Sequence, residues 1–386
     1  MATALAGALL PAFTAAYRYS YEARAYGLMM GLFALSLYAW SEAARDRRRT
    51  VHLPLLTIAL AASLWNHYYA VLTFIPIAGG EAVRTIRRRA FDGGMLAAFG
   101  VAALLTLPLI PLAAVARAQS QSFWSPAAFA DVGHVYDFLF PAMTDRPIVI
   151  GAIVFAALMV AARRPRHARQ PPRTLPAHEV IAGLLALAMP AIGVTLGVFL
   201  TGVFVPRYGM ATIVGFALVI PMAVWASHTR WGIAELLLCL FLANVFWQGI
   251  GPSLASPPAF RDPFLSRPLL MESVAAGPVV SSSSLQFLQY WYYAPAAQKG
   301  RLQYLADPAE ARKYMKSDTI DRGYLTLRRW TAVPIEPYTD YVAGHREFRV
   351  HEAGAGWLLR KLDEMGAARE EVASRSGERV YVVRLR

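Results

Sequence analysis

The stretch AYGLMMGLFALSLYAW, residues 25–40, runs directly into the basic segment SEAARDRRR, residues 41–49, and this pairing decides the fold. An apolar run of this length is typical of a membrane-spanning helix. Arginines collect in the cytoplasmic loops of such proteins. The same pairing recurs along the chain, and four loops carry the arginines concerned: Arg45, Arg47, Arg48 and Arg49; Arg84, Arg87, Arg88 and Arg89; Arg163, Arg164, Arg166, Arg169 and Arg173; and Arg230.

The composition is that of an integral membrane protein. Of 386 residues, 56% are hydrophobic and 16% are charged, and the mean hydropathy is +0.37. The net charge of +13 does not indicate nucleic-acid binding, because the excess lies in short loops where membrane topology requires it. The single cysteine, Cys239, excludes a disulfide within the chain and a site built from several thiolates.

Apolar runs predict nine membrane spans, and the basic loops set their direction. Loops 42–52 and 80–92 are both expected in the cytoplasm, so the chain must cross out and return between them, turning at His67-Tyr68-Tyr69. This topology places everything after about residue 251 outside the cytoplasm. The spans lie near residues 2–16, 25–41, 53–66, 69–84, 95–115, 148–162, 179–200, 208–226 and 232–250.

We therefore predict a helical membrane domain over residues 1–250, a Pro- and Ser-rich linker over 251–276 and a small α/β domain over 277–386. In the last region, residues 301–305 and 379–384 have strand character. Residues 308–315 predict a helix with Asp307 as its N-cap. Residues 357–365 predict a second helix that ends at Gly366.

Three polar groups fall at the outer ends of separate spans. They are Glu22, Arg24 and Tyr26; Asn66, His67, Tyr68 and Tyr69; and Arg207 with Tyr208. Ionisable residues at a membrane boundary are costly unless they pair or face a polar cavity, and a guanidinium suits a phosphate. We expect the groups to converge on one site for a substrate with an anionic head and an apolar tail. A snorkelling arginine paired with Glu22, and an aromatic belt around His67, are the structural alternatives.

Two further segments contain side chains suited to catalysis or binding. The outer loop 116–147 contains Asp131, His134 and Asp137, for which solvation and capping are the expected roles. The run 290–293, Tyr-Trp-Tyr-Tyr, is suited either to stacking on sugar rings or to core packing. No second histidine stands at metal-ligand spacing from His67, and no Gly-rich phosphate loop is present, so we expect neither a metal nor a cofactor.

The segments YSYEARAYGLMMGLFALSLYAW (19–40), LWNHYYAVLTF (64–74) and VPRYGMATIVGFALVIP (205–221) resemble the middle and later spans of family 39-type bacterial glycosyltransferases. These membrane enzymes are related to protein O-mannosyltransferases and lipid A aminoarabinose transferases. The tail from PVVSSSSLQFLQYWYYAP (278–295) onward is similar to the small periplasmic domain of some members.

The resemblance implies a GT-C fold in the bacterial inner membrane and sugar transfer from a polyprenyl-phosphate donor on the periplasmic face. It implies that Arg24 and Arg207 lie on the phosphate side of the donor, assisted by Tyr26, His67 and Tyr208, and Glu22 and Tyr68 complete the expected substrate-binding set. The family's acidic motif lies upstream of the segment that matches Glu22. The catalytic acid is therefore expected before residue 1, in which case this sequence is a fragment, has a misassigned start, or belongs to a shortened and inactive relative.

Two other functions fit the same residues. The first is a non-catalytic membrane protein that binds or transports a lipid-linked sugar. Transporters place polar residues near the bilayer midplane, whereas here they gather at one face, which favours interfacial catalysis or binding. The second is a sensor with an outer ligand-binding domain, which ranks last because the inner loops are too short for a signalling domain.

Overall fold

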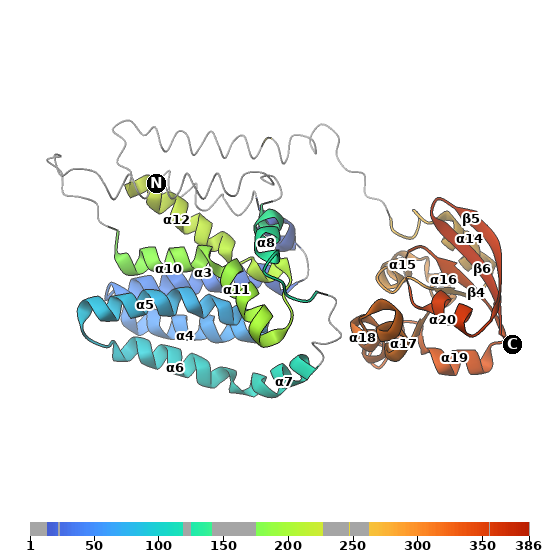
Figure 1. Cartoon of the computed structure of the whole chain (residues 1–386), viewed down its shortest axis with the longest axis horizontal. Helices are drawn as coiled ribbons and strands as arrows, with labels where there is room; N and C mark the ends of the chain where they lie inside the picture. The colour runs from blue at the N-terminus through green and yellow to red at the C-terminus, as the bar shows by residue number, and fades with distance from the viewer. Residues whose placement is uncertain are drawn as a thin grey trace. The chain divides into compact units, whose positions relative to one another are not determined.

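The computed structural model describes residues 14–21, 24–118, 125–140, 175–226, 247, 262–354 and 356–385. The described residues form two compact units, a helical one and an α/β one, and the division between them falls at Pro257 and Pro258 (Figure 1).

The helical unit consists of helices joined by short turns, several of them tightened into 3-10 geometry. Its elements are α2 (Ala15–Tyr21), α3 (Ala25–Ala44), α4 (Arg49–Asn66), η2 (Tyr68–Thr73), α5 (Phe74–Arg88), α6 (Gly93–Thr106), η3 (Leu107–Leu109), α7 (Ile110–Ala118), α8 (Asp131–Leu139), α10 (Ala177–Leu187), α11 (Met189–Leu196), η6 (Gly197–Thr201), η7 (Pro206–Gly209) and α12 (Thr212–Ala226). Helix α3 packs on α4, α4 on α6, α5 on α10, and α10 on α12.

Small residues allow the helices to approach closely. A Cβ on Gly80 of α5 would lie 2.6 Å from the Trp40 ring and 2.9 Å from the His178 carbonyl oxygen. A Cβ on Gly215 of α12 would lie 2.8 Å from Ala186 of α10. Close backbone contact through small residues is the packing mode expected of helices in lipid, where hydrophobic exclusion contributes little between them.

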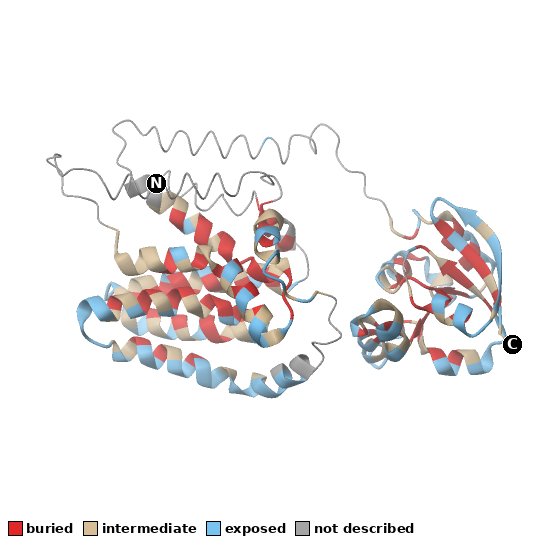
Figure 2. Cartoon of the chain, in the orientation of Figure 1, coloured by how far each residue is buried: buried red, intermediate tan, exposed pale blue. Residues whose placement is uncertain are grey.

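Helix α6 is largely exposed on its outer side (Figure 2), and the side chains there are apolar. Its outer side chains are about half exposed or more, and they continue into α7; they are Leu96, Val101, Leu104, Leu105, Leu107, Ile110, Leu112 and Val115. The stretch Gly93–Leu112 is, among the described residues, the one continuous helical stretch that is long and apolar enough to cross a membrane, and only 17% of it is buried. An exposed apolar surface of this extent marks contact with lipid or a partner rather than with water.

Other predicted spans have counterparts that are shorter or bent. Helices α10 and α11–η6 cover the span predicted near 179–200, but they meet at an angle of 56°. Helix α4 ends at Asn66, and His67 is extended with φ −161°, so the predicted turn between the third and fourth spans lies where the helix stops. The spans near 148–162 and 232–250, and most of 2–16, lie outside the described residues. Nine spans thus remain a prediction.

One end of the helical unit, where α3 ends, α4 begins, α5 ends and α6 begins, contains a buried ionic network. The Trp40 indole donates to Glu81 over 3.0 Å, and Arg84 donates to Glu81 over 2.7 Å and to Asp92 over 3.0 Å. Arg49 holds Asp92 with two further hydrogen bonds. We call this the basic end of the unit.

The position of Arg84 differs from the expectation that it lies in an arginine-rich cytoplasmic loop. It lies on α5 and is 4% exposed. Burial alone would raise the pKa of Asp92, but hydrogen bonds from Arg49, the Met95 amide and Arg84 outweigh it and hold the pKa of that carboxyl well below its usual range. Asp92 thus remains charged and joins α4, α5 and α6.

Asp92→Asn is expected to destabilise the helical unit by about 3 kcal/mol, because it leaves buried arginine charge without its partner. Asparagine is as good an N-cap as aspartate, so the cap on the Met95 amide is kept and the loss reports on charge. The measurement is chemical unfolding of the chain in lipid–detergent micelles, followed by helical circular dichroism.

Asp46→Asn is the matched control, because Asp46 also contacts Arg49 but its side chain is 68% exposed. Its expected cost is at most about 0.5 kcal/mol. Equal losses for the two variants would contradict the role assigned to the buried network.

The α/β unit is a six-stranded mixed sheet in the order β3-β2-β1-β4-β6-β5. Strands β3, β2, β1 and β4 are parallel to one another, β6 pairs antiparallel with β4, and β5 pairs antiparallel with β6. The elements are α14 (Pro268–Ala276), β1 (Val279–Ser281), α15 (Phe287–Tyr293), α16 (Ala296–Lys299), β2 (Leu302–Ala306), α17 (Pro308–Met315), α18 (Thr319–Leu327), β3 (Ile335–Pro337), α19 (Tyr338–Gly344), β4 (Glu347–Glu352), α20 (Leu358–Glu364), β5 (Ala368–Arg375) and β6 (Glu378–Arg384).

Alternation along the strands builds a core on each face of this sheet. Val279 packs with residues of α14, α15 and α18, whereas the next residue, Val280, packs with residues of α17, α19 and α20. The predicted C-terminal α/β region is therefore confirmed. The helix predicted from Pro308 is also confirmed, and Asp307 accepts hydrogen bonds from the amides of Ala309 and Glu310 as its N-cap.

Part of the range predicted as a linker has regular structure. Residues 268–276 form α14, which buries Leu270 and Val274 against the sheet. The Leu270 amide donates to Glu378, which also contacts His351 over 2.8 Å. Helix α14 is therefore an integral part of the α/β unit.

A buried carboxyl, Asp321 of α18, joins α18 to strand β2, to the residue that follows β2 and to Trp357. It is 3% exposed and accepts hydrogen bonds from the Asp307 amide and the Trp357 indole, both over 3.0 Å, and from the Tyr304 hydroxyl. Burial raises the pKa of Asp321 to about 6, although these hydrogen bonds lower it in part.

Because the pKa of Asp321 is higher in the folded state than in the unfolded state, the native state binds more protons between pH 4 and 6. The stability of the α/β unit should therefore fall as pH rises through this interval, by up to about 3 kcal/mol. Asp321→Asn should remove this slope. The measurement is hydrogen exchange of β1 and β2 peptides in the full chain, corrected for intrinsic exchange. An unchanged slope in the variant would assign the effect elsewhere.

Candidate functional site

Three segments far apart in the sequence meet at the other end of the helical unit, which we call the aromatic end. Tyr26 lies in the first turn of α3, His67 lies between α4 and η2, and Arg207 and Tyr208 lie in η7. The side-chain amide of Asn66 donates to the Ala25 carbonyl oxygen over 2.7 Å and thereby ties the end of α4 to the start of α3.

Arg207 joins η7 to α3. Its Nε donates to the Tyr26 hydroxyl over 2.8 Å, and the guanidinium carbon lies 5.8 Å from the centre of the Tyr26 ring. These residues are 181 positions apart in the chain. An Nε–H bond of this kind orients the planar fork of the guanidinium, because the remaining donors lie in the same plane.

The rings around Arg207 form one continuous aromatic cluster. Tyr208 stacks on Tyr69 with ring centres 4.2 Å apart, and His67 stacks on Tyr68 at 5.0 Å. His67 also contacts Tyr208 at 5.1 Å and Tyr26 at 5.3 Å. Tyr26, Tyr69 and Tyr208 are buried, whereas Tyr68 is 49% exposed and forms the outer side of the cluster.

The imidazole of His67 is held neutral. Burial lowers the pKa of His67 to about 4, with a further contribution from the positive charge of Arg207. The Tyr69 amide donates to His67 Nδ1 over 3.2 Å, so in the neutral ring the proton is assigned to Nε2. A neutral histidine beside a fixed cation can donate one hydrogen bond to an anion without adding charge.

The cluster combines a guanidinium, a neutral imidazole and phenol hydroxyls, all of them hydrogen-bond donors. Among the described residues, no hydrogen bond of Tyr26, His67 or Tyr208 involves a carboxylate. Aromatic faces and donors suit an anionic oxygen attached to a ring or an apolar chain. Groups of three or more His, Cys, Asp or Glu side chains able to hold a metal do not occur among the residues that the structure describes.

Of the residues predicted for the site, the structure brings together Tyr26, His67, Tyr68, Arg207 and Tyr208. Arg24 is exposed and directly precedes the first residue of α3. Glu22 lies outside the described residues, so its pairing with an arginine stays a prediction.

Sequence reasoning placed Tyr69 at the outer turn but not in the expected substrate-binding set, whereas in the structure it supports the whole cluster. Its hydroxyl donates to the Val203 carbonyl oxygen and contacts the Thr201 hydroxyl at 2.8 Å. These contacts fix the chain just before η7, and hence the place of Tyr208. The only available signal was the neighbouring pair Tyr68-Tyr69, which does not distinguish a supporting tyrosine from an exposed one.

The outer loop predicted over 116–147 contains a helix that closes one side of the cluster. Helix α8 buries Val135 and packs against η7. Asp131 accepts from the Ala128 amide over 2.8 Å and lies 3.8 Å from His134. These contacts hold the turn that leads into α8.

The aromatic end and the basic end are opposite ends of the same helices. Helix α3 has 20 residues and α4 has 18, so at 1.5 Å per residue the ends are about 30 Å apart. This length matches the hydrocarbon thickness of a bilayer. Tyr26 and Asn66 lie at one end, and Arg45 and Arg49 lie at the other.

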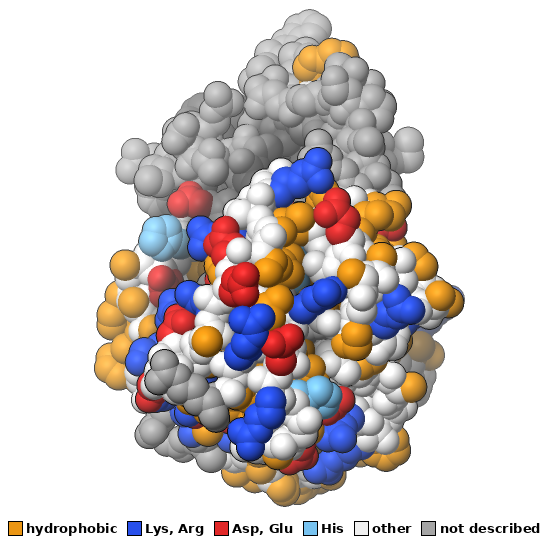
Figure 3. Space-filling model, turned by 90° about the vertical axis from the view of Figure 1, so that its right-hand side faces the viewer, with side chains coloured by type: hydrophobic (Ala, Val, Ile, Leu, Met, Phe, Trp, Pro, Cys, Tyr) orange, Lys and Arg blue, Asp and Glu red, His pale blue; other side chains and the backbone are white. Residues whose placement is uncertain are grey.

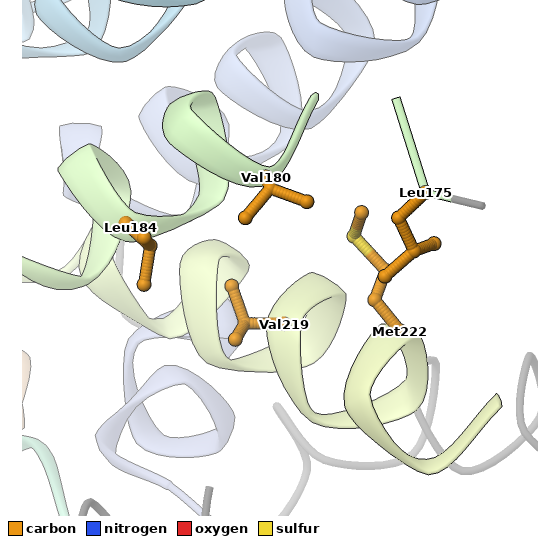
Figure 4. Close-up of a pocket in the computed structure, with 5 residues that line it drawn as sticks. All are labelled: Leu175, Val180, Leu184, Val219 and Met222. Atoms are coloured by element: carbon orange, nitrogen blue, oxygen red, sulfur yellow. The ribbon is translucent and has the colours of Figure 1, made fainter. Parts of the chain in front are cut away.

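Two other features are separate from this cluster. A small apolar pocket between α10 and α12 is lined by Leu175, Val180, Leu184, Val219 and Met222 and has no polar side chain to orient a substrate (Figure 4). The run 290–293 divides its roles, since Tyr290 is 2% exposed in the core and Tyr292 is 66% exposed.

Comparisons with known proteins add one finding. No family model matches the chain, and no curated protein matches it. The crystal structure of ArnT from Cupriavidus metallidurans in the apo state aligns with 99% of this chain and 82% of that chain, at 13% identity and a TM-score of 0.45. A TM-score at this level does not establish a common fold.

His67 gives the helical unit a pH dependence opposite to that of the α/β unit. The pKa of His67 is lower in the folded state than the unfolded value near 6.5, so the unfolded state binds more protons between pH 6.5 and 4. Stability should therefore be lost as pH falls through this interval, by at most about 3 kcal/mol. His67→Gln should flatten the slope. Hydrogen exchange of α3 and α4 peptides in micelles measures it, and an equal slope in both proteins would contradict the assignment.

Proposed function

We propose that this protein is a membrane glycosyltransferase of the GT-C type that uses a polyprenyl-phosphate-linked sugar at the aromatic end of its helical unit. The observation that carries the proposal is the convergence of Arg207, His67 and Tyr208 with Tyr26 at one end of the helices. The arginine-rich loops at the other end, about 30 Å away, favour the cytoplasm for that end and the outer face for the cluster.

The cluster has the chemistry that the donor's phosphate requires. In the transfer, the bond between the anomeric carbon and the phosphate oxygen breaks, and the phosphate leaves with both electrons. A new bond forms to the acceptor oxygen or nitrogen, which loses a proton. Arg207 and neutral His67 are placed to donate hydrogen bonds to the departing phosphate, where negative charge develops. The rings of Tyr68 and Tyr208 offer faces for the sugar or the first isoprene units.

Non-catalytic binding of the same lipid-linked sugar is the second candidate. It is supported by the hydrogen-bond donors of the described cluster, which would hold the donor's phosphate whether or not the sugar is transferred. Binding and transfer must therefore be measured separately.

Arg207→Gln is expected to weaken binding of a polyprenyl-phosphate sugar by roughly 50-fold, because it removes a charged hydrogen bond to the phosphate. The measurement uses the full chain in proteoliposomes and records two quantities, donor binding and release of polyprenyl phosphate. Tyr26→Phe removes the acceptor for Arg207 Nε but keeps the charge and the ring, so a loss of only a few-fold is expected.

Arg47→Gln is the matched control, since Arg47 lies at the basic end and its side chain is 66% exposed. It should change neither binding nor release. Binding that depends on Arg207 without any release of polyprenyl phosphate would favour the non-catalytic binder. Absence of donor binding to the unmodified chain would contradict both proposed functions.

A further inference from the structure

We propose that the basic end of the helical unit binds the headgroups of anionic phospholipids through a set of three arginines, Arg48, Arg87 and Arg89, which we call the arginine rim. This inference concerns a lipid partner and is independent of sugar transfer. It shares with the proposed function only the placement of the helical unit in a membrane.

The arginine rim differs from the other arginines of the basic end in its ion pairs. Within the described residues, five of its arginines contact a carboxylate: Arg45 with Glu42 and Glu179, Arg47 with Glu42, Arg49 with Asp46 and Asp92, Arg84 with Glu81 and Asp92, and Arg88 with Asp92. Arg48, Arg87 and Arg89 are exposed, and no carboxylate among the residues that the structure describes lies within ion-pair distance of them. Their charge is therefore available to an external anion.

The backbone holds these side chains at the ends of helices. Arg48 directly precedes α4 with φ 39°, and Arg89 directly follows α5 with φ 54°. Arg87 lies in the last turn of α5. The buried contacts of Arg49 and Arg84 with Asp92 fix the ends of α4, α5 and α6 relative to one another, so the rim does not depend on a long loop.

Apolar side chains beside the rim identify the anion's source. Ile86 is 72% exposed and Phe91 is 81% exposed, and they flank Arg87 and Arg89 in the sequence. Helix α6 begins two residues after Phe91, and its exposed apolar surface begins at Leu96. A soluble anion would contact only the arginines. A phospholipid would place its phosphate beside the arginines and its acyl chains against the apolar side chains of α6.

The remaining surface offers a contrast. On the face of the α/β unit that Figure 3 shows, Lys and Arg side chains are interspersed with Asp and Glu. Arg328 and Arg329 of this unit are exposed, and no ion pair of either is found among the described residues. They provide a control in which the same charge is removed from the other unit.

The test measures lipid enrichment next to the rim in the full chain. Cys239→Ser and Ala90→Cys place a single donor dye at exposed residue 90, and the chain is assembled into phosphatidylcholine nanodiscs. Trace phosphatidylglycerol or phosphatidylcholine with an acceptor dye on the acyl chain is then added. Energy transfer should show that phosphatidylglycerol is enriched near residue 90 relative to phosphatidylcholine. The expected enrichment is roughly fivefold per arginine at low salt and smaller at high salt.

Arg87→Gln with Arg89→Gln should lower the preference by roughly 25-fold and leave only the contribution of Arg48. Arg328→Gln with Arg329→Gln should leave the preference unchanged. Arg87→Lys with Arg89→Lys keeps the charge and should keep at least half of the preference, which also shows that both positions tolerate substitution. The proposal is overturned by equal transfer in the unmodified chain, by a glutamine pair that leaves the preference undiminished, or by a lysine pair that loses as much as the glutamine pair.

Discussion

The structure of the helical unit depends on one constraint: within the described residues, its charged groups lie toward the two ends of helices about 30 Å long. Between the ends, α3, α4 and α6 offer almost only apolar side chains. Every charge must therefore be satisfied at an end, by a partner or by water, because a bilayer interior satisfies neither backbone nor side-chain polar groups. The two ends meet this requirement in different ways, and the difference separates structural charge from candidate binding groups.

At the basic end, carboxylates neutralise arginines in a buried network around Asp92 and Glu81. At the aromatic end, Arg207 donates to a phenol, Tyr26, and lies beside its ring. The imidazole of His67 in the same cluster is neutral and can donate a hydrogen bond to an anion. These donors support the proposal of a phosphate-bearing substrate at the aromatic end.

The α/β unit is organised by strand alternation, helix capping and a surface of mixed charge. Its strands alternate between two cores, its helix α17 begins at an aspartate cap, and its charges of both signs are intermixed on the face shown in Figure 3. Several boundaries here could be predicted from the sequence, because caps, stops and strand alternation are encoded within a few residues. The sheet order could not be predicted, since strand neighbours such as β1 and β4 are about 70 residues apart. Helix α14 was missed because the Pro-rich sequence before it resembles a linker. Only the packing of Leu270 and Val274 against the sheet shows that the helix belongs to the α/β unit.

The sequence by itself determined the apolar helices, the basic loops between them, the C-terminal α/β region and the residue types of the candidate site. These properties follow from hydropathy, charge and short-range periodicity, which need no knowledge of the partner across the fold. Only the tertiary structure decided which charges are neutralised. Arg84 and Arg87 are equivalent in the sequence, yet one is buried against Glu81 and Asp92 and the other is exposed. Likewise, Tyr69 became the support of the cluster because its hydroxyl reaches Thr201, 132 residues away, a contact that no local pattern encodes.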